Sequence, residues 1–189
     1  MKTQFFLIFL LAIFFSTVAQ AEQTCRKNIE QSTPDSRYIF HDDGTLTDIK
    51  TKITWMRCAL GQKWDGKTCL GNATHYDWQQ AKEAVADLNS DSFGEPTLWR
   101  LPKVPELASI VERQCFQPRV NLSAFPATPA QLFWTAMEKK GDGKIAYAID
   151  FNEGAITLSN KSGAAPVRLM LDGPGKKWWN LPKKTLSSR

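Results

Sequence analysis

The spacing of apolar and polar residues changes along the chain, and its first regular pattern is that of paired strands. Residues 37–48 place the apolar run Tyr38-Ile-Phe40 and the segment Thr45-Leu-Thr-Asp48 on either side of an Asp-Asp-Gly sequence at 42–44. Asp-Gly favours the positive φ angles of a tight turn, so this segment predicts a β-hairpin. Residues 51–55 are again rich in β-branched and aromatic side chains, and we expect them to form a further extended segment.

Apolar residues then recur at the spacing of an amphipathic helix. The residues on its apolar face are Trp78, Ala81, Val85 and Leu88. Asp77 is placed to cap this helix while Gln80 reaches back to it, and we expect the helix to end near Ser90. A second apolar stripe predicts a helix over 105–113, with Pro105 in its first turn.

The last part of the chain has the pattern of short strands separated by glycine-containing turns at 141–143 and 152–154. The predicted strands cover residues 133–135, 144–151, 155–158 and 166–171. Two early helices and a late antiparallel sheet predict the α+β class, with the helices packed on short antiparallel strands.

The first 21 residues have the organisation of a secretory signal peptide. Lys2 precedes an apolar stretch at 5–15, and Ala19-Gln20-Ala21 supplies the small residues that a signal peptidase recognises. We expect cleavage after Ala21 and export to the periplasm or the extracellular space. No other apolar stretch approaches the length of a membrane span, so we expect no transmembrane span in the mature chain.

Charge divides the mature chain into a domain over 22–172 and a basic tail over 173–189. The whole chain has a formal charge of +5, and the tail alone carries four lysines and one arginine without an acid, which leaves the domain close to neutral. Cations next to tryptophans suit contact with an anionic glycan, lipid headgroups or an acidic partner. The alternatives are a solvated tail, or tryptophans that fold back onto the domain. The tail residues predicted to contact a ligand are Lys176, Lys177, Trp178, Trp179, Lys183 and Lys184.

Four cysteines in an exported chain predict two disulfides, for which three pairings exist. Cys58 and Cys69 enclose a short loop with an Asp-Gly turn at 65–66, so they meet often. We therefore favour this pair, which leaves Cys25 to bond with Cys115.

The loop between Cys58 and Cys69 also matches the phosphate-binding P-loop pattern at 61–68. That motif needs a helix that begins at its Lys-Thr, whereas Cys-Leu-Gly-Asn follows here. We therefore exclude nucleotide binding. We interpret the loop as a disulfide-closed protrusion, with Trp55 in the core and Trp64 at its tip as a further candidate ligand contact.

Motifs for catalysis or metal binding are missing from the sequence. It has no His-Glu-x-x-His, Gly-x-Ser-x-Gly or Cys-x-x-Cys, and its two histidines fall in different loops. Asp42, Asp43 and Asp48 are compatible with a calcium site, but we favour turn chemistry for them. Arg100 is expected to be partly buried on backbone carbonyls or Glu106, with anion binding as the alternative. We expect no catalytic residue, metal, cofactor or nucleic acid ligand.

Taken in order, the motifs of residues 37–172 closely resemble the Lcl C-terminal domain family of bacterial exported proteins. The motifs that carry this resemblance are Gly44-Thr-Leu-Thr-Asp48, Trp55, Arg57-Cys58, the loop 61–69, Trp78, Ala81, Trp99-Arg-Leu-Pro102, Glu106-Leu107, Cys115-Phe-Gln-Pro118, Phe125-Pro126, Phe133-Trp134 and Asp150-Phe-Asn-Glu-Gly154. The resemblance implies a fold related to C-type lectins and to formylglycine-generating enzymes. It also implies surface adhesion, because the name-giving member resembles a collagen-like adhesin whose C-terminal part meets sulfated glycans.

These patterns together predict an exported, non-enzymatic binding or adhesion module. Its expected partner is an anionic polysaccharide or a protein of the cell envelope. The second hypothesis is a structural or assembly component of the envelope that has no glycan ligand. An enzyme ranks third, because it would need a pocket with titratable groups of perturbed pKa.

Overall fold

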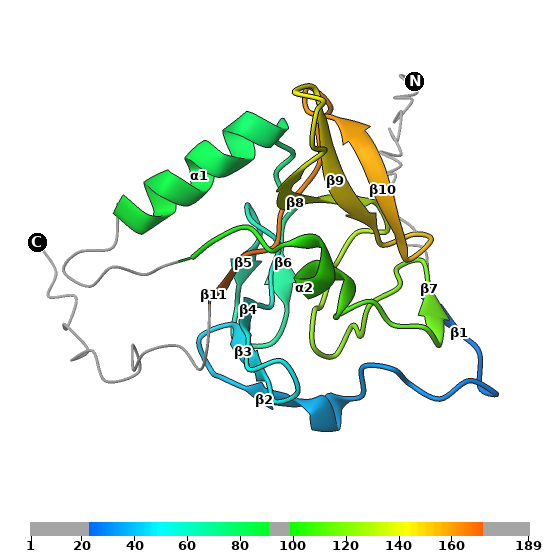
Figure 1. Ribbon diagram of the computed structural model, residues 1–189. Coiled ribbons are helices and arrows are strands. Elements are labelled where there is room, and N and C mark those ends of the chain that lie inside the picture. Colours follow the sequence, from blue (N-terminus) through cyan, green and yellow to red (C-terminus); the bar gives the residue numbers. More distant parts are fainter. Residues whose placement is uncertain (1–22, 91–98, 172–189) are drawn as a thin grey trace, which may run out of the picture.

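The computed structural model describes residues 23–90 and 99–171, so the predicted signal peptide and basic tail lie outside the described residues (Figure 1). The helical elements are η1 (Asp35–Arg37), α1 (Trp78–Ser90) and α2 (Val104–Ala108). The strands are β1 (Thr24–Cys25), β2 (Tyr38–Phe40), β3 (Thr45–Asp48), β4 (Thr54–Met56), β5 (Lys63–Trp64), β6 (Cys69–Leu70), β7 (Cys115–Phe116), β8 (Leu132–Glu138), β9 (Ile145–Asp150), β10 (Ala155–Asn160) and β11 (Met170–Leu171).

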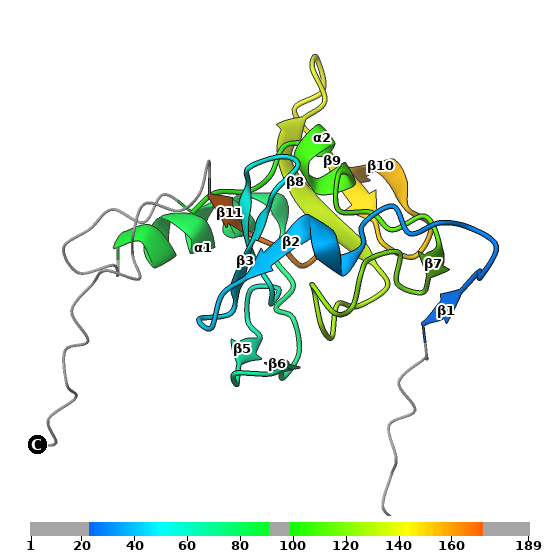
Figure 2. The ribbon, with the colours of Figure 1, turned by 90° about the horizontal axis from the view of Figure 1, so that it is seen from below.

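In the described part of the chain, the strands form small antiparallel sheets. The largest has the order β11-β4-β3-β2, the next has the order β10-β9-β8, and the pairs β1-β7 and β5-β6 stand alone. Figure 1 shows α2 between the two larger sheets and α1 to one side of them. Figure 2 shows the β5–β6 hairpin projecting from the body of the molecule. The structure therefore confirms the α+β class.

The β8–β10 sheet contributes side chains to both hydrophobic clusters of the core. Successive side chains of a strand point to opposite faces of its sheet. Phe133 and Ile149, which are register partners, pack in the cluster that contains Leu107 of α2. Trp134 and Ala148 pack in the cluster that contains the apolar face of α1. The two helices thus cover opposite faces of one sheet.

The predicted hairpin and helix cap are both confirmed. β2 pairs with β3, and Gly44 at their turn has a φ of 83°. At the start of α1, Asp77 Oδ1 accepts the backbone N–H of Gln80 at 2.7 Å. Gln80 Oε1 accepts the backbone N–H of Asp77 at 3.0 Å, which completes a reciprocal cap. Short-range signals in the sequence were sufficient for both features.

Several predicted elements have the wrong length, and β8 (Leu132–Glu138) extends well beyond the strand predicted at 133–135. The second helix ends at Ala108 rather than near residue 113, because Val111 leaves the helical path to bridge Val120. The predicted last strand is also shorter, since only Met170 and Leu171 of the segment 166–171 are in regular strand conformation. The strands β1, β5, β6 and β7 were not predicted, because two-residue strands have no periodicity to detect.

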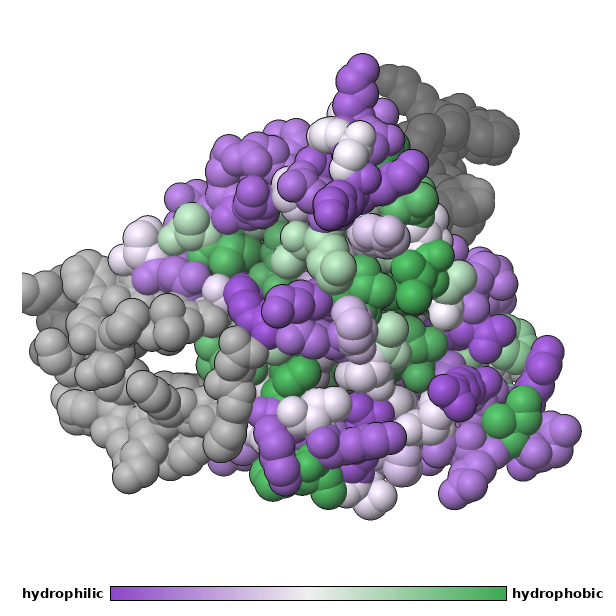
Figure 3. Space-filling model, in the orientation of Figure 1, coloured by the Kyte–Doolittle hydropathy of each residue, from purple (hydrophilic) through white to green (hydrophobic). Residues whose placement is uncertain are grey.

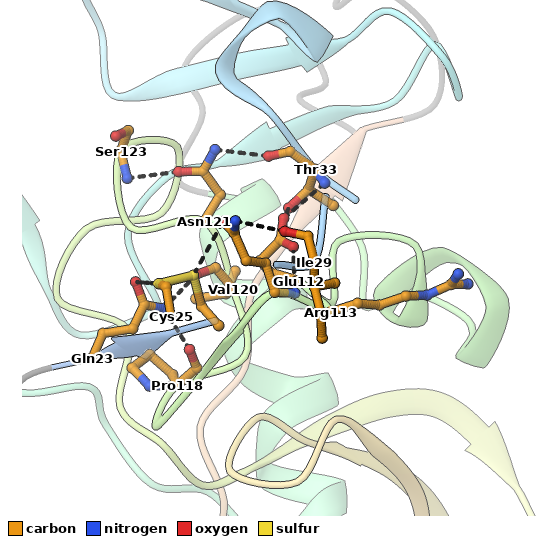
Figure 4. The surroundings of a disulfide bond; sticks show 12 residues. Gln23, Cys25, Ile29, Thr33, Glu112, Arg113, Pro118, Val120, Asn121 and Ser123 are labelled. Carbon is orange, nitrogen blue, oxygen red and sulfur yellow. Dashed lines mark hydrogen bonds between the residues drawn. A yellow bond between two sulfur atoms is a disulfide. The ribbon is translucent and has the colours of Figure 1, made fainter. Parts of the chain in front are cut away.

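Both predicted disulfides are present, and all four cysteines are paired. Cys58–Cys69 closes the β5–β6 hairpin, and Cys25–Cys115 joins β1 to β7. Figure 4 shows Gln23 beside the second bond, where its Nε2 donates to the carbonyl of Val120 at 2.8 Å. The N-terminal end of the described domain is therefore attached to its centre by one covalent bond and by hydrogen bonds.

Arg168 is fully buried, and it joins the end of β4 to the segment before β8. Its Nη1 donates to the carbonyl oxygens of Met56 and Arg57, and its Nη2 donates to Thr128 Oγ1 at 2.6 Å. The guanidinium also lies 4.8 Å from the ring centroid of Phe125. Burial lowers the pKa of Arg168 to about 9, which leaves it charged at neutral pH.

Candidate functional site

A cleft of about 570 Å³ lies between the start of the domain, the segment after α2 and the β9–β10 turn. We call it the basic cleft, because four cations and two carboxylates line it. These residues are Arg37, Lys50, Arg113, Arg119, Glu112 and Glu153. They come from parts of the chain that are far apart in sequence, so folding alone brings them together.

Arg37 forms a buried ion pair with Asp48 at one end of the basic cleft. Its Nε donates to Asp48 Oδ1 at 2.9 Å, its Nη2 donates to Oδ2, and its Nη1 donates to the carbonyl of Ser109 at 2.9 Å. Burial opposes ionisation of Asp48, but hydrogen bonds from Arg37 and from the turn that follows hold its pKa below the usual value. This pair therefore serves the fold, and its cation is not available to a ligand.

The carboxylate of Glu112 is likewise hydrogen-bonded to other residues of the domain, as Figure 4 shows. Its Oε1 accepts the backbone N–H groups of Ser32 and Gln114, and its Oε2 accepts the backbone N–H and the hydroxyl of Thr33. Burial raises the pKa of Glu112, but these hydrogen bonds outweigh it and lower the pKa overall. The carboxylate thus fixes the wall of the cleft and is covered by donors. In the same view, Arg113 points away from this network.

Three cations of the basic cleft have no ion pair with any carboxylate in residues 23–90 and 99–171: Lys50, Arg113 and Arg119. Lys50 and Arg113 are exposed, whereas Arg119 is half-buried. Glu153, at the rim, accepts a hydrogen bond from Asn152 Nδ2 at 2.6 Å. The cleft therefore offers positive charge that the described part of the fold does not neutralise.

Arg119 is the most constrained of these three cations. Its Nε is buried and has no hydrogen-bond acceptor among the described residues. Gly154, which has a φ of 71°, makes room for it, since a Cβ there would lie 2.5 Å from Arg119 Cδ. A larger residue at this position would be strained and would displace the arginine. Gly154 was identified from the sequence as a turn residue and as part of a family motif, but Arg119, which belongs to no motif, was missed.

The carboxylates of Asp48 and Glu112 stabilise the fold around the cleft, so we expect the protein to become less stable as the pH falls. Asp48 and Glu112 have lowered pKa values, so their stabilising contribution is complete above the unfolded pKa of about 4 and is lost as the pH falls below it. We expect the urea midpoint of the mature protein to fall between about pH 4 and pH 2. Asp48→Asn should lower the midpoint at pH 7 and weaken this dependence.

Asp42→Asn, at an exposed turn position, is the matched control for the acid experiment. It should leave the midpoint at pH 7 and its loss on acidification close to those of the unchanged protein. An acid profile of Asp48→Asn that parallels the unchanged profile would contradict the assignment to the Arg37–Asp48 pair.

Trp64, predicted at the tip of the disulfide-closed loop, lies beside the first hairpin instead. Its indole N–H donates to the carbonyl of Asp42 at 3.1 Å, and the Arg57 guanidinium lies 4.1 Å from its ring centroid. A Cβ at Gly44 would lie 2.6 Å from Trp64 Cγ, so the indole packs on the hairpin turn. The turn of the loop is formed by residues 65–68, and Trp55 is in the core as predicted.

Three further sequence predictions concern Arg100, the P-loop-like sequence and the basic tail. Arg100 donates to both carboxylate oxygens of Glu106, at 2.9 and 2.7 Å, which confirms the predicted partner and leaves anion binding without support. Residues 69–70, which follow the P-loop-like sequence, form β6 rather than a helix. The six tail residues between 176 and 184 lie outside the described residues. Their predicted role in binding is therefore untested.

Neither a metal-binding cluster nor a membrane-spanning helix is found in the described part of the chain. No group of three or more His, Cys, Asp or Glu side chains there is arranged to hold a metal ion. Asp48, one of the residues considered for calcium, has its carboxylate paired with Arg37. Neither α1 nor α2 has the length and apolar character needed to cross a bilayer.

Comparison with protein families shows which family the chain is similar to. The family model described as the Lcl C-terminal domain matches residues 44–171, which is more than half of the 189-residue chain. No curated protein matches the chain. The matched segment contains the Cys58–Cys69 loop, both described α-helices and Arg119.

Proposed function

This chain belongs to the Lcl C-terminal domain family, and on that premise we propose that it is an exported, non-enzymatic module that binds an anionic polysaccharide. The basic cleft is the proposed binding site. Its ligand would present sulfate or carboxylate groups to Lys50, Arg113 and Arg119, and hydroxyl groups to the polar wall around Ser32 and Thr33.

The main observation behind this proposal is that Lys50, Arg113 and Arg119 of the basic cleft form no ion pair with a carboxylate in the described part of the chain. Arg119 supports it most directly, since its buried Nε lacks an acceptor among the described residues. An arginine offers planar, forked donors that match the oxygens of sulfate and carboxylate groups. A ligand oxygen near this Nε would remove the cost of leaving a buried donor unpaired.

Export is supported by the two disulfides of the described domain, because disulfides persist in an oxidising compartment. A non-enzymatic role is supported by Glu112 in the cleft, because its pKa is lowered and its two oxygens accept hydrogen bonds from Ser32, Thr33 and Gln114, which makes it a poor general base. The two helices, short antiparallel strands and two disulfides are compatible with the proposed relation to the C-type lectin fold.

The proposal is tested by retention of the mature protein on immobilised heparin, a sulfated polysaccharide. We expect the variant with Lys50→Gln, Arg113→Gln and Arg119→Gln to elute at a lower salt concentration. Each well-placed cation contributes about 1 kcal/mol at an anionic surface, so the loss of three should lower the affinity at low salt by a factor on the order of 100. Thermal melting of the variant checks that its domain remains folded.

A matched control carries the same loss of charge at exposed lysines elsewhere: Lys63→Gln, Lys67→Gln and Lys140→Gln. If this control elutes as early as the cleft variant, retention depends on net charge and the cleft is not the site. A version that ends at Asp172 tests the tail in the same way. If it alone loses retention, the binding site is the tail predicted from the sequence.

A structural role in the cell envelope is the second candidate, favoured by the exposed edge of the β8–β10 sheet. Ile156 and Leu158 of the edge strand β10 are 58% and 48% exposed. Figure 3 shows apolar residues gathered around α2 and the lower end of β10. An exposed apolar edge strand is a common place for another chain to pair. Assembly without any polysaccharide ligand would favour this candidate.

A further inference from the structure

A second hollow, separate from the basic cleft, is almost entirely apolar. This apolar groove has a volume of about 440 Å³ and lies between the first hairpin, the segment 56–62 and the end of β11. Large apolar side chains on its lining are Met56, Leu60, Trp64, Trp99 and Leu171. Asp43 is the single charged residue among those that line it. The groove is therefore suited to flat apolar groups with a cation beside them.

The position of the groove links it to the C-terminal tail. Leu171 is the last described residue, and it forms part of the groove lining. Trp178 follows Leu171 by seven residues, which reach at most about 25 Å when fully extended. The pair of tail tryptophans is thus covalently attached at the edge of the groove and has enough chain to turn back into it.

The chemistry of the tail complements the groove. An indole buries about 150–250 Å² of surface, so two adjacent tryptophans gain much by leaving water. Lys176 and Lys177 precede them and Lys183 and Lys184 follow, with no acid in the tail. Asp43 at the rim would face these cations. Attachment to the domain also keeps the effective concentration of the tail high.

We propose that Trp178 and Trp179 of the same chain occupy the apolar groove, with the tail lysines held beside Asp43 and open to solvent. The groove then serves as an intramolecular dock that fixes where the basic tail is displayed. This inference does not rest on polysaccharide binding. It holds equally for a tail that meets another anionic partner, because it concerns only how the tail is anchored.

Photo-cross-linking of the full mature chain tests the dock. Trp179 is replaced by p-benzoylphenylalanine, and the matched control carries the same group in place of Lys184. We expect position 179 to give an intramolecular adduct that maps to the segment 56–62, which includes Met56 and Leu60. Position 184 should not give this adduct. Adducts from position 179 that join two molecules, or that map outside the groove, would overturn the proposal.

Hydrogen exchange provides a second measurement that does not depend on the cross-linker. The full chain with Trp178→Ala and Trp179→Ala should lose exchange protection in the segment 54–62, whereas Lys183→Ala with Lys184→Ala should retain it. The segment 91–98 is the competing occupant, since the residue that follows it, Trp99, lines the groove. If Phe93→Ala removes protection and the double tryptophan variant does not, this segment fills the groove and the proposal is wrong.

Discussion

Arg168→Ala is expected to lower the free energy of unfolding by about 3 to 5 kcal/mol. The substitution removes three donated hydrogen bonds, to the carbonyls of Met56 and Arg57 and to Thr128 Oγ1, in a fully buried environment. It also leaves a cavity beside Phe125, which the guanidinium contacts. Buried acceptors without donors and a buried cavity both destabilise, and here they occur together.

Chemical denaturation of the oxidised mature protein at pH 7 measures this loss. Arg168→Met separates the two causes, because methionine fills much of the volume but donates no hydrogen bond, so an intermediate loss is expected. Arg26→Ala is the control, since Arg26 is an exposed arginine that also lies over a ring, that of Phe116. Equal midpoints for Arg168→Ala and Arg26→Ala would contradict the role assigned to the buried arginine.

Removal of the Cys25–Cys115 disulfide is the second change with a large expected effect. The bond joins residues separated by 90 positions, so it greatly restricts the unfolded chain. In the chain-entropy model, the double variant Cys25→Ser and Cys115→Ser loses about 4 to 5 kcal/mol of unfolding free energy. Cys58 and Cys69 are separated by only 11 positions, and their loss is expected to cost about 3 kcal/mol.

Guanidinium denaturation of the two double variants, compared with the unchanged protein, ranks the two bonds. The variant without Cys25–Cys115 should have the lower midpoint. A lower midpoint for the variant without Cys58–Cys69 would show that local packing of the β5–β6 hairpin outweighs chain entropy. The single variant Cys25→Ser keeps Cys115 as a free thiol and is a less clear comparison, because that thiol is free to exchange with the other disulfide.

The sequence predicted those parts of the fold that depend on residues close together in the chain. The hairpin around Gly44 and the cap formed by Asp77 and Gln80 were predicted and are present, because turns and caps depend on neighbours within a few residues. The disulfide pairing followed from the short spacing of Cys58 and Cys69. Failures occurred where tertiary contacts overrode local preference, as at Val111, which left the expected helix to pair with Val120.

The candidate sites could not be predicted in this way. Lys50, Arg113 and Arg119 carry no motif, and the basic cleft exists only because the start of the domain packs against the segment after α2. Trp64 was placed wrongly at the tip of its loop, since its contact with Gly44 joins two hairpins that are separate in sequence. Arg168 appears in the sequence as part of an unremarkable strand.

By itself, the sequence determined the α+β class, the two disulfides and membership of the Lcl C-terminal domain family. Periodicity, turn residues and the order of motifs are properties of the chain, so they can be read without coordinates. Only the tertiary structure decided which cations remain unneutralised, which arginine is buried and where apolar surface forms a groove. These properties depend on distances between residues far apart in the sequence, and such distances are set by packing rather than by local pattern.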